Sequence, residues 1–317
     1  MVLPLPGGVT RSDDGPRRIP VLINPRGGSA DKVLELLRAD SRFVVHETDP
    51  RVLTDRVRAL VDEGVRRIAV SGGDGTVTAA AATLCGSDVE LAVIPGGTLN
   101  HLARDNGIPV EPEQAAEIAA TGTAHPIDVG RVNEHVFLNT SAVGAYVSFV
   151  RTRERLESWM PYWPASVLAG LQLLARMPRF AVHIDAAGDQ PARSYQACLV
   201  FVSVGERDFD KGVFGARTTE SRRGLHVIVV PNAGWRRLSR LVLGAVFRGM
   251  QAELGQVDSF VVDECRIEMR RRHGNVSFDG EIRALDAPLR YRIEHDRVRL
   301  VAPAPIGGER PPSAEAR

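Results

Sequence analysis

Short apolar runs alternate with amphipathic stretches along the first 120 residues of the chain. The apolar runs have the length of buried strands, and the stretches between them repeat apolar residues at helical spacing. The predicted strands are residues 19–23, 43–46, 68–70 and 91–94. The first predicted helix begins near residue 29. Further helices are predicted at residues 53–63, 77–84, 100–106 and 113–120. This alternation of strand and helix predicts a parallel sheet covered by helices.

The pattern changes after residue 125, where strand-like runs follow one another with few helices between them. A hairpin is expected around Asn133 and Glu134, between residues 126–132 and 135–143. Further strands are expected at residues 180–185, 197–204, 225–230, 257–262, 266–269, 275–278, 289–293 and 298–301. Helices are expected at residues 161–177 and 235–250. Such a series predicts an antiparallel β-sandwich.

We therefore expect two folded domains between two loose ends, and 317 residues suffice for a core in each. The expected parts are a flexible tail at residues 1–16, an α/β domain at 17–124, a β-sandwich domain at 125–302 and a disordered tail at 303–317. The apolar and charged fractions, 44% and 25%, are those of an ordinary globular protein.

Charge and cysteine usage narrow the function classes. The formal net charge of +1 provides no overall field for nucleic acid, so we expect no nucleic-acid partner. Lys32 and Lys211 are the only lysines, and no Gly-Lys-Ser/Thr loop exists, which excludes a P-loop kinase. The three cysteines show no metal-ligand spacing, the first residues lack a secretory leader, and no apolar stretch is long enough to span a bilayer. We expect a cytoplasmic protein.

Two glycine-rich turns carry the candidate chemistry. Residues 72–76, Gly-Gly-Asp-Gly-Thr, follow one predicted strand, and residues 95–98, Pro-Gly-Gly-Thr, follow the next one about 25 residues later. The carboxyl ends of parallel strands meet at one edge, where glycine lets backbone N–H groups approach a phosphate. A carboxylate at Asp74 would repel a phosphate, which points to Mg²⁺-nucleotide chemistry. The alternative is an ordinary turn in which Asp74 caps the following helix.

With these turns, the chain resembles the diacylglycerol kinase and sphingosine kinase catalytic-domain superfamily, and most of all its soluble bacterial lipid kinases. The motifs that carry the resemblance are residues 24–28, 72–76, 95–100, 103–104, 107–109 and 279–281. Each motif is weak alone, but together they stand in the order of the family and extend from about residue 18 to residue 301.

The resemblance implies a fold and an activity. The fold would be a Rossmann-like α/β domain, like those of phosphofructokinase and NAD kinase, followed by an antiparallel β-sandwich domain that takes the lipid. The activity would be ATP-dependent transfer of the γ-phosphate to a hydroxyl of a diacylglycerol-like or long-chain lipid, with Mg²⁺. The implied ATP-binding residues are Asn24, Pro25, Gly27, Thr48, Gly72, Gly73, Asp74, Gly75, Thr76, Gly97, Thr98 and Asn100.

The resemblance also implies the catalytic residues. Glu281 would be the general base, Asp279 would stand beside it, and Asp74 would hold the catalytic Mg²⁺ through the phosphates. Two departures leave a slower enzyme or a non-catalytic nucleotide or lipid binder open. Thr78 and Ala79 replace Asn and Glu of relatives, and Arg222-Arg223 stands where relatives place an aspartate that binds a structural metal ion. We expect that metal site to be absent, unless Glu220 substitutes.

Two further alternatives concern the substrate and the partners. A small-molecule kinase of the NAD kinase type shares the Gly-Gly-Asp-Gly turn, but residues 97–100 favour a lipid kinase. The patch made of Trp159, Pro161, Tyr162 and Trp163 with Arg151, Arg153 and Arg155 has two interpretations. It docks at a lipid headgroup layer or packs between domains. The expected partners are a lipid substrate and a transient, peripheral membrane contact, and a homodimer is left open.

Overall fold

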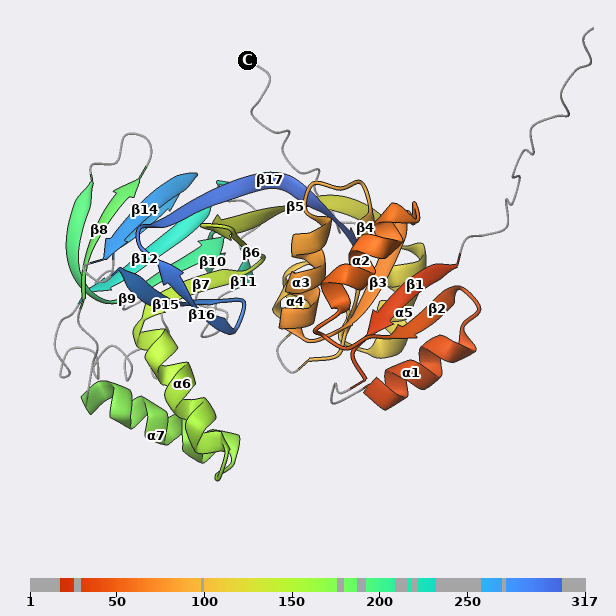
Figure 1. Cartoon of the computed structure of the whole chain (residues 1–317), viewed down its shortest axis with the longest axis horizontal. Helices are drawn as coiled ribbons and strands as arrows, with labels where there is room; N and C mark the ends of the chain where they lie inside the picture. The colour runs from red at the N-terminus through yellow and green to blue at the C-terminus, as the bar shows by residue number, and fades with distance from the viewer. Residues whose placement is uncertain are drawn as a thin grey trace, which may run out of the picture.

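The computed structural model consists of two domains that lie side by side and are joined by two long, paired strands (Figure 1). It describes residues 18–25, 30–97, 100–175, 180–186, 192–208, 216–217, 222–231, 258–269 and 272–303. The predicted helix at residues 235–250 and most of the predicted tails lie outside these ranges.

The first domain has the strands and helices that the hydrophobic pattern predicts. The strands are β1 (Ile19–Ile23), β2 (Phe43–Glu47), β3 (Arg67–Gly72) and β4 (Glu90–Pro95). The helices are α1 (Ala30–Ala39), α2 (Leu53–Asp62), α3 (Asp74–Leu84), α4 (His101–Asp105) and α5 (Pro112–Thr121). Nearly every residue of β1, β3 and β4 is buried, as expected for parallel strands with helices on both faces.

The parallel strands lie in the order β2-β1-β3-β4. The chain first moves from β1 to β2 on one side and then to β3 and β4 on the other. The strand order therefore reverses between β1 and β3. In open α/β sheets ligands bind in the crevice outside the carboxyl ends of the strands at such a reversal, and here the residues after β1 and β3 flank it.

The second domain is built from antiparallel strands around its own hydrophobic core, which includes Phe137 and Tyr291. Its strands are β5 (Thr123–Val132), β6 (His135–Phe137), β7 (Thr140–Gly144), β8 (Phe180–Ala186), β9 (Arg193–Val204), β10 (Arg207–Asp208), β11 (Ala216–Arg217), β12 (Leu225–Pro231), β13 (Asp258–Val262), β14 (Glu264–Met269), β15 (His273–Phe278) and β16 (Glu281–Asp286). The predicted fold class, a Rossmann-like α/β domain followed by an antiparallel β domain, is confirmed.

Strand β17 (Leu289–Ala302) joins the two domains. Its first part pairs with β14, its last part pairs in parallel with β4, and β5 pairs with it along both. The sequence predicts two separate strands here, which is wrong. The polar residues between them form a bulge, where the register shifts between Glu294 and Val298.

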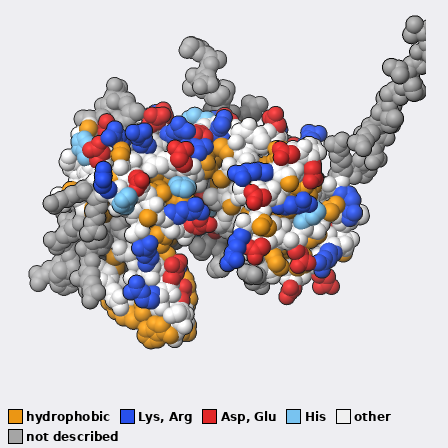
Figure 2. Space-filling view, in the orientation of Figure 1, with side chains coloured by type: hydrophobic (Ala, Val, Ile, Leu, Met, Phe, Trp, Pro, Cys, Tyr) orange, Lys and Arg blue, Asp and Glu red, His pale blue; other side chains and the backbone are white. Residues whose placement is uncertain are grey.

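Two helices project from the second domain as a hairpin, α6 (Ala145–Glu157) and α7 (Tyr162–Ala175). The sequence predicts α7 but not α6. In Figure 2, positive and negative side chains are mixed over the face in view, whereas apolar side chains gather at the tip of this hairpin. Among the helices that the structure describes, none has both the length and the apolarity needed to cross a bilayer.

Candidate active site

The predicted nucleotide-binding residues gather at the carboxyl edge of the parallel sheet. Pairing of Ile23 with Ser71 and with Glu47, and of Gly72 with Pro95, brings the ends of all four strands level. Asn24 and Pro25 follow β1, and the backbone N–H of Asn24 donates to the Ser71 carbonyl over 3.2 Å. Gly27 and Thr98, also predicted to bind the nucleotide, lie outside the described residues.

The two glycine turns pack backbone against backbone. The N–H of Gly96 donates to the carbonyl of Gly72 over 2.9 Å. A Cβ on Gly97 would lie 2.6 Å from the Cα of Gly73, and a Cβ on Gly72 would lie 2.8 Å from Thr76. Gly97 therefore needs glycine because the two turns touch each other, and Gly72 needs it because the Thr76 side chain of its own turn lies against it. Both requirements are separate from any ligand.

Gly73 is different. Among the residues that the structure describes, a Cβ built there would meet the Cα of Gly97, at an ordinary 3.5 Å, and its φ of −82° and ψ of 177° suit any residue. The described part of the protein thus tolerates a side chain at Gly73. Glycine directly before α3 leaves room for a ligand at the N-terminus of that helix.

Asn100 and Asp74 hold the second turn. Asn100 has a left-handed backbone, with φ of 51°, and its side chain both accepts from the N–H and donates to the carbonyl of Gly97, over 3.0 and 2.7 Å. Asp74 is the first residue of α3, and its Oδ1 accepts the backbone N–H of His101 over 2.8 Å. Asp74 therefore caps α4 rather than its own helix and ties the two glycine turns together.

Thr48 lies at the end of β2, level with this edge. It is buried, its N–H donates to the Ile23 carbonyl over 2.8 Å, and its hydroxyl donates to the His46 carbonyl over 3.0 Å. The residue therefore shapes the start of the loop after β2 through backbone contacts.

Asp279 sits in the tight turn between β15 and β16; it is partly buried, and hydrogen-bond donors surround its carboxylate. One carboxylate oxygen accepts the N–H groups of Asn139 and Thr140, over 2.9 and 3.0 Å. The other accepts the N–H of Leu138 over 2.6 Å and the hydroxyl of Thr78 over 2.9 Å. Burial raises the pKa of Asp279, and these donated hydrogen bonds oppose that rise. The carboxylate thus links α3 of the first domain to the second domain.

Glu281, two residues later, has a different environment. Its side chain is half exposed, and one carboxylate oxygen pairs with the Arg283 guanidinium over 3.0 Å. The other oxygen lies 3.3 Å from the position that a Cβ on Gly75 would take. A carboxylate of the second domain therefore lies against the first turn of α3, beside the glycine turn of the first domain. Asp279, with φ of 46°, and Gly280, with φ of 90°, shape the turn that places it there.

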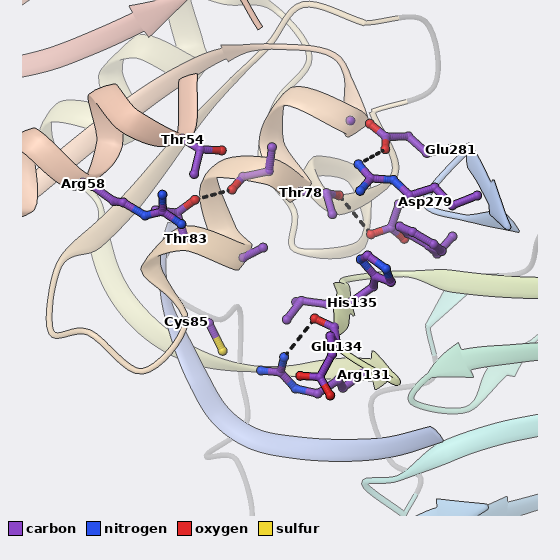
Figure 3. A pocket seen from close by; sticks show the side chains of 16 residues that line it. Thr54, Arg58, Thr78, Thr83, Cys85, Arg131, Glu134, His135, Asp279 and Glu281 are labelled. Carbon is purple, nitrogen blue, oxygen red and sulfur yellow. Dashed lines mark hydrogen bonds and ion pairs between the residues drawn. The ribbon is translucent and has the colours of Figure 1, made fainter. Parts of the chain in front are cut away.

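A cavity of about 470 Å³ opens between the domains beside Glu281 (Figure 3). Helices α2 and α3 form one wall, and β5, β6, β15 and β16 form the other. Its polar lining includes residues that the sequence did not indicate: Thr54, Arg58, Thr83, Arg131, Glu134, His135 and Arg283. Burial, and next the charge of Arg283, lowers the pKa of His135, which stacks on Phe278 at 5.3 Å. These residues come from segments that are far apart in the sequence, so no local motif marks them.

The two arginines that depart from the family pattern are both paired. Arg222 reaches Asp263 over 3.2 Å at the surface. Arg223 binds the buried carboxylate of Asp128 through two nitrogens, one of them at 2.9 Å, and reaches Asp296 over 2.8 Å. Burial opposes ionisation of Asp128, but Arg223 and the N–H of Asp296 outweigh it, so its pKa is lowered. The Arg223 guanidinium thus supplies the positive charge between the carboxylates of Asp128 and Asp296.

Glu220, the one substitute ligand that the sequence offered, lies outside the described residues. Within the described ranges, no group of three or more His, Cys, Asp or Glu side chains could hold a metal ion. The absence of a structural metal stays a prediction.

Arg223→Ala is expected to destabilise the fold by about 3 kcal/mol, because it removes the guanidinium that neutralises a buried carboxylate. Arg222→Ala removes an exposed pair and should change the free energy of unfolding by about 1 kcal/mol at most. Urea unfolding of both variants measures this. Since the folded-state pKa of Asp128 lies below its unfolded value, the Arg223 effect should be present above about pH 4 and fade as the pH falls through the folded pKa. Loss of wild-type stability on metal chelation would contradict this assignment.

Comparison with known proteins shows what this chain is similar to. Residues 18–132 match the family model of the diacylglycerol kinase catalytic domain. A diacylglycerol kinase of Mycobacterium tuberculosis H37Rv is 29% identical over 211 residues, which cover 63% of this chain and 66% of that protein. A probable lipid kinase, YegS-like, of Pseudomonas aeruginosa PAO1 is 36% identical over 157 residues, or 47% of this chain and 49% of that protein. The chain thus spans about two thirds of the first relative and half of the second.

The fold has close solved counterparts. A crystal structure of a diacylglycerol kinase from Bacillus anthracis strain Sterne superposes with a TM-score of 0.67 at 20% identity, covering 90% of this chain and 96% of that one. At this identity the likeness concerns the fold. The glycine turns and the edge where they meet lie in the first domain, and the family model covers that domain and β5. Residues 18–132 are therefore similar to the diacylglycerol kinase catalytic domain.

Proposed function

We propose that the protein is a lipid kinase that transfers the γ-phosphate of ATP to a hydroxyl of a diacylglycerol-like or long-chain lipid. One observation carries the proposal. The Glu281 carboxylate of the second domain lies against Gly75, at the start of the helix whose N-terminus suits a phosphate. A base and a phosphate-binding turn from different domains thus face one reaction site.

The donor side of this site lies in the first domain. Backbone N–H groups at the glycine turns and the N-terminal end of α3 would bind the phosphates. Mg²⁺ binds through one or two carboxylates together with substrate phosphates. Asp74 lies at the junction of the two turns. Its carboxylate fits that pattern and would be a ligand of the ion. The ion, when bound, would spread charge from the phosphoryl oxygens.

The acceptor side belongs to the second domain. Glu281 would take the proton of the lipid hydroxyl as it attacks, which requires hydrogen-bond reach to that oxygen. Asp279 has its carboxylate surrounded by four donors and is better suited to a positioning role. It would hold the turn from which Glu281 extends.

Incubation of the purified protein with radiolabelled ATP and a lipid extract tests the proposal. Label should move into a chloroform-soluble product, and parallel incubation with NAD should give no labelled NADP. Labelled NADP would mean that the acceptor is a small molecule and not a lipid. No transfer to either acceptor, together with measurable ATP binding, would identify a non-catalytic binder.

Asp74→Asn is expected to slow turnover by roughly 10²-fold, the scale of a lost transition-state contact. The amide oxygen of asparagine still accepts the N–H of His101, so the turn keeps its shape. Steady-state kinetics at saturating Mg²⁺ measures the effect, with exposed Asp88→Asn as a control of equal charge change. Near-normal turnover of Asp74→Asn would leave Asp74 with its capping role alone.

A further inference from the structure

The α6–α7 hairpin has an inner face that is already packed. Leu156 of α6 and Ala165 and Ala169 of α7 are buried together, and Phe149 and Leu168 pack against them. The hairpin thus satisfies its own apolar contacts on this side. Any apolar residue on the opposite side of α7 is not needed to hold the two helices together.

That opposite side is nevertheless apolar. Trp163, Val167 and Leu171 follow one another at one-turn spacing and are 77%, 62% and 58% exposed. Trp159 and Tyr162, next to them at the hairpin tip, are 68% and 52% exposed. No charged residue occurs anywhere in α7. Figure 2 shows the resulting apolar surface at the projecting end of the molecule.

The chemistry of this surface suits the interface of a lipid bilayer. Tryptophan and tyrosine favour the headgroup level, and a row of aliphatic side chains on one helix face inserts among the acyl chains. Arg151 and Arg155, both exposed, stand on the adjoining helix α6. Arg153 lies over the Tyr162 ring at 5.1 Å and pairs with Glu157. Apolar residues flanked by arginines match a bilayer that contains anionic lipid.

The hairpin is also connected to the candidate site. Helix α6 begins directly after β7, and β7 pairs with β15 through Ser141 and Phe278. Thr140, the first residue of β7, donates its N–H to Asp279 in the turn that positions Glu281. The exposed surface is therefore connected through α6 and β7 to the turn that positions the proposed base.

We propose that Trp159, Tyr162, Trp163, Val167 and Leu171 form the docking surface by which the protein binds an anionic lipid bilayer. This inference rests on the proposed function, since a kinase acting on membrane lipids must meet the membrane. The exposed tip projects from the body of the protein as a convex ridge (Figure 1). A fluid lipid layer accommodates such a ridge without a preformed groove.

Flotation of the full chain with vesicles, without ATP, tests the docking surface. Wild-type protein should float with vesicles of phosphatidylcholine and phosphatidylglycerol. Trp163→Ser/Leu171→Ser should bind roughly 10- to 100-fold more weakly, since two large apolar side chains no longer leave water. Val110→Ser, an exposed valine far from the hairpin in sequence, should bind as wild type does. Arg151→Gln/Arg155→Gln should weaken binding about 5- to 25-fold, and only where phosphatidylglycerol is present.

Three results would overturn the inference. The first is wild-type flotation by the Trp163→Ser/Leu171→Ser protein with an unchanged melting curve. The second is no flotation of the wild type. The third is a wild-type dimer that this variant converts to a monomer, which would assign the surface to a second copy. Phosphorylation of lipid dispersed in detergent micelles separates the two proposals. Retained activity there with lost flotation supports docking, whereas flotation without activity in any form of the substrate overturns the proposed function alone.

Discussion

Glu281→Gln is expected to lower turnover by about 10²- to 10⁴-fold, the range that removal of a general base produces. Glutamine keeps the size of the side chain and can still accept a hydrogen bond from Arg283, but it cannot take the proton of a lipid hydroxyl. ATP affinity should stay within about twofold, because the proposed phosphate contacts all lie in the first domain. Single-turnover kinetics and calorimetric titration with ATP measure the two effects separately.

Asp279→Asn is the informative companion of this variant. An amide can accept from Asn139 and Thr140 on its oxygen, but its NH₂ group would then face the N–H of Leu138. We expect a loss of stability of about 1–3 kcal/mol, the cost of a buried unsatisfied donor. Glu281→Gln should leave the free energy of unfolding unchanged, since Glu281 is half exposed.

The pair of variants decides between the carboxylates. A stable but inactive Glu281→Gln with a destabilised Asp279→Asn supports the proposed roles. Full activity of Glu281→Gln would remove Glu281 as the base. If Asp279→Asn were then also active, Asp74 would become the leading candidate for the base.

Gly73→Val is expected to abolish nucleotide binding in a protein that still folds. The backbone of Gly73 suits a β-branched residue, and a Cβ there meets the Cα of Gly97 at an ordinary contact distance. The added methyl groups would fill the open space at the start of α3, where a phosphate would approach the backbone. Calorimetric ATP titration and thermal melting of the variant test both halves of the prediction.

Gly97→Ala supplies the contrast within the same junction. Its Cβ would lie 2.6 Å from backbone, so the two turns would have to separate. We expect this smaller substitution to lower the melting temperature, unlike Gly73→Val. An unchanged ATP affinity in a folded Gly73→Val protein would refute the glycine-turn site.

The first domain could be predicted from sequence because its signals are local. Each strand is one buried apolar run, each glycine turn follows a strand directly, and the βαβ spacing sets the parallel order. The same logic predicts that residues 72–76 and 95–98 lie at one edge of the sheet. What the pattern could not show is that Gly97 is needed for contact between the turns and Gly72 for contact with Thr76.

The hydrophobic pattern predicts the elements of the second domain less completely. Strand β16 is mostly exposed, so its side chains show no apolar alternation to detect. Helix α6 contains Phe and Val residues typical of strands, and its helical state is settled by packing on α7. The difference between Asp279 and Glu281 depends on burial, which spacing within a three-residue turn cannot reveal.

Strand β17 has a consequence for biosynthesis. The first domain is complete only when Leu300 pairs beside Leu91, a partner made roughly 200 residues earlier. At about 5–20 residues per second, β4 would wait for its neighbour for about 10 to 40 s on the ribosome. During that time the growing chain carries an open, apolar sheet edge, which is a template for aggregation. We expect a ribosome-associated chaperone that binds apolar strands to bind this nascent protein mainly at β4.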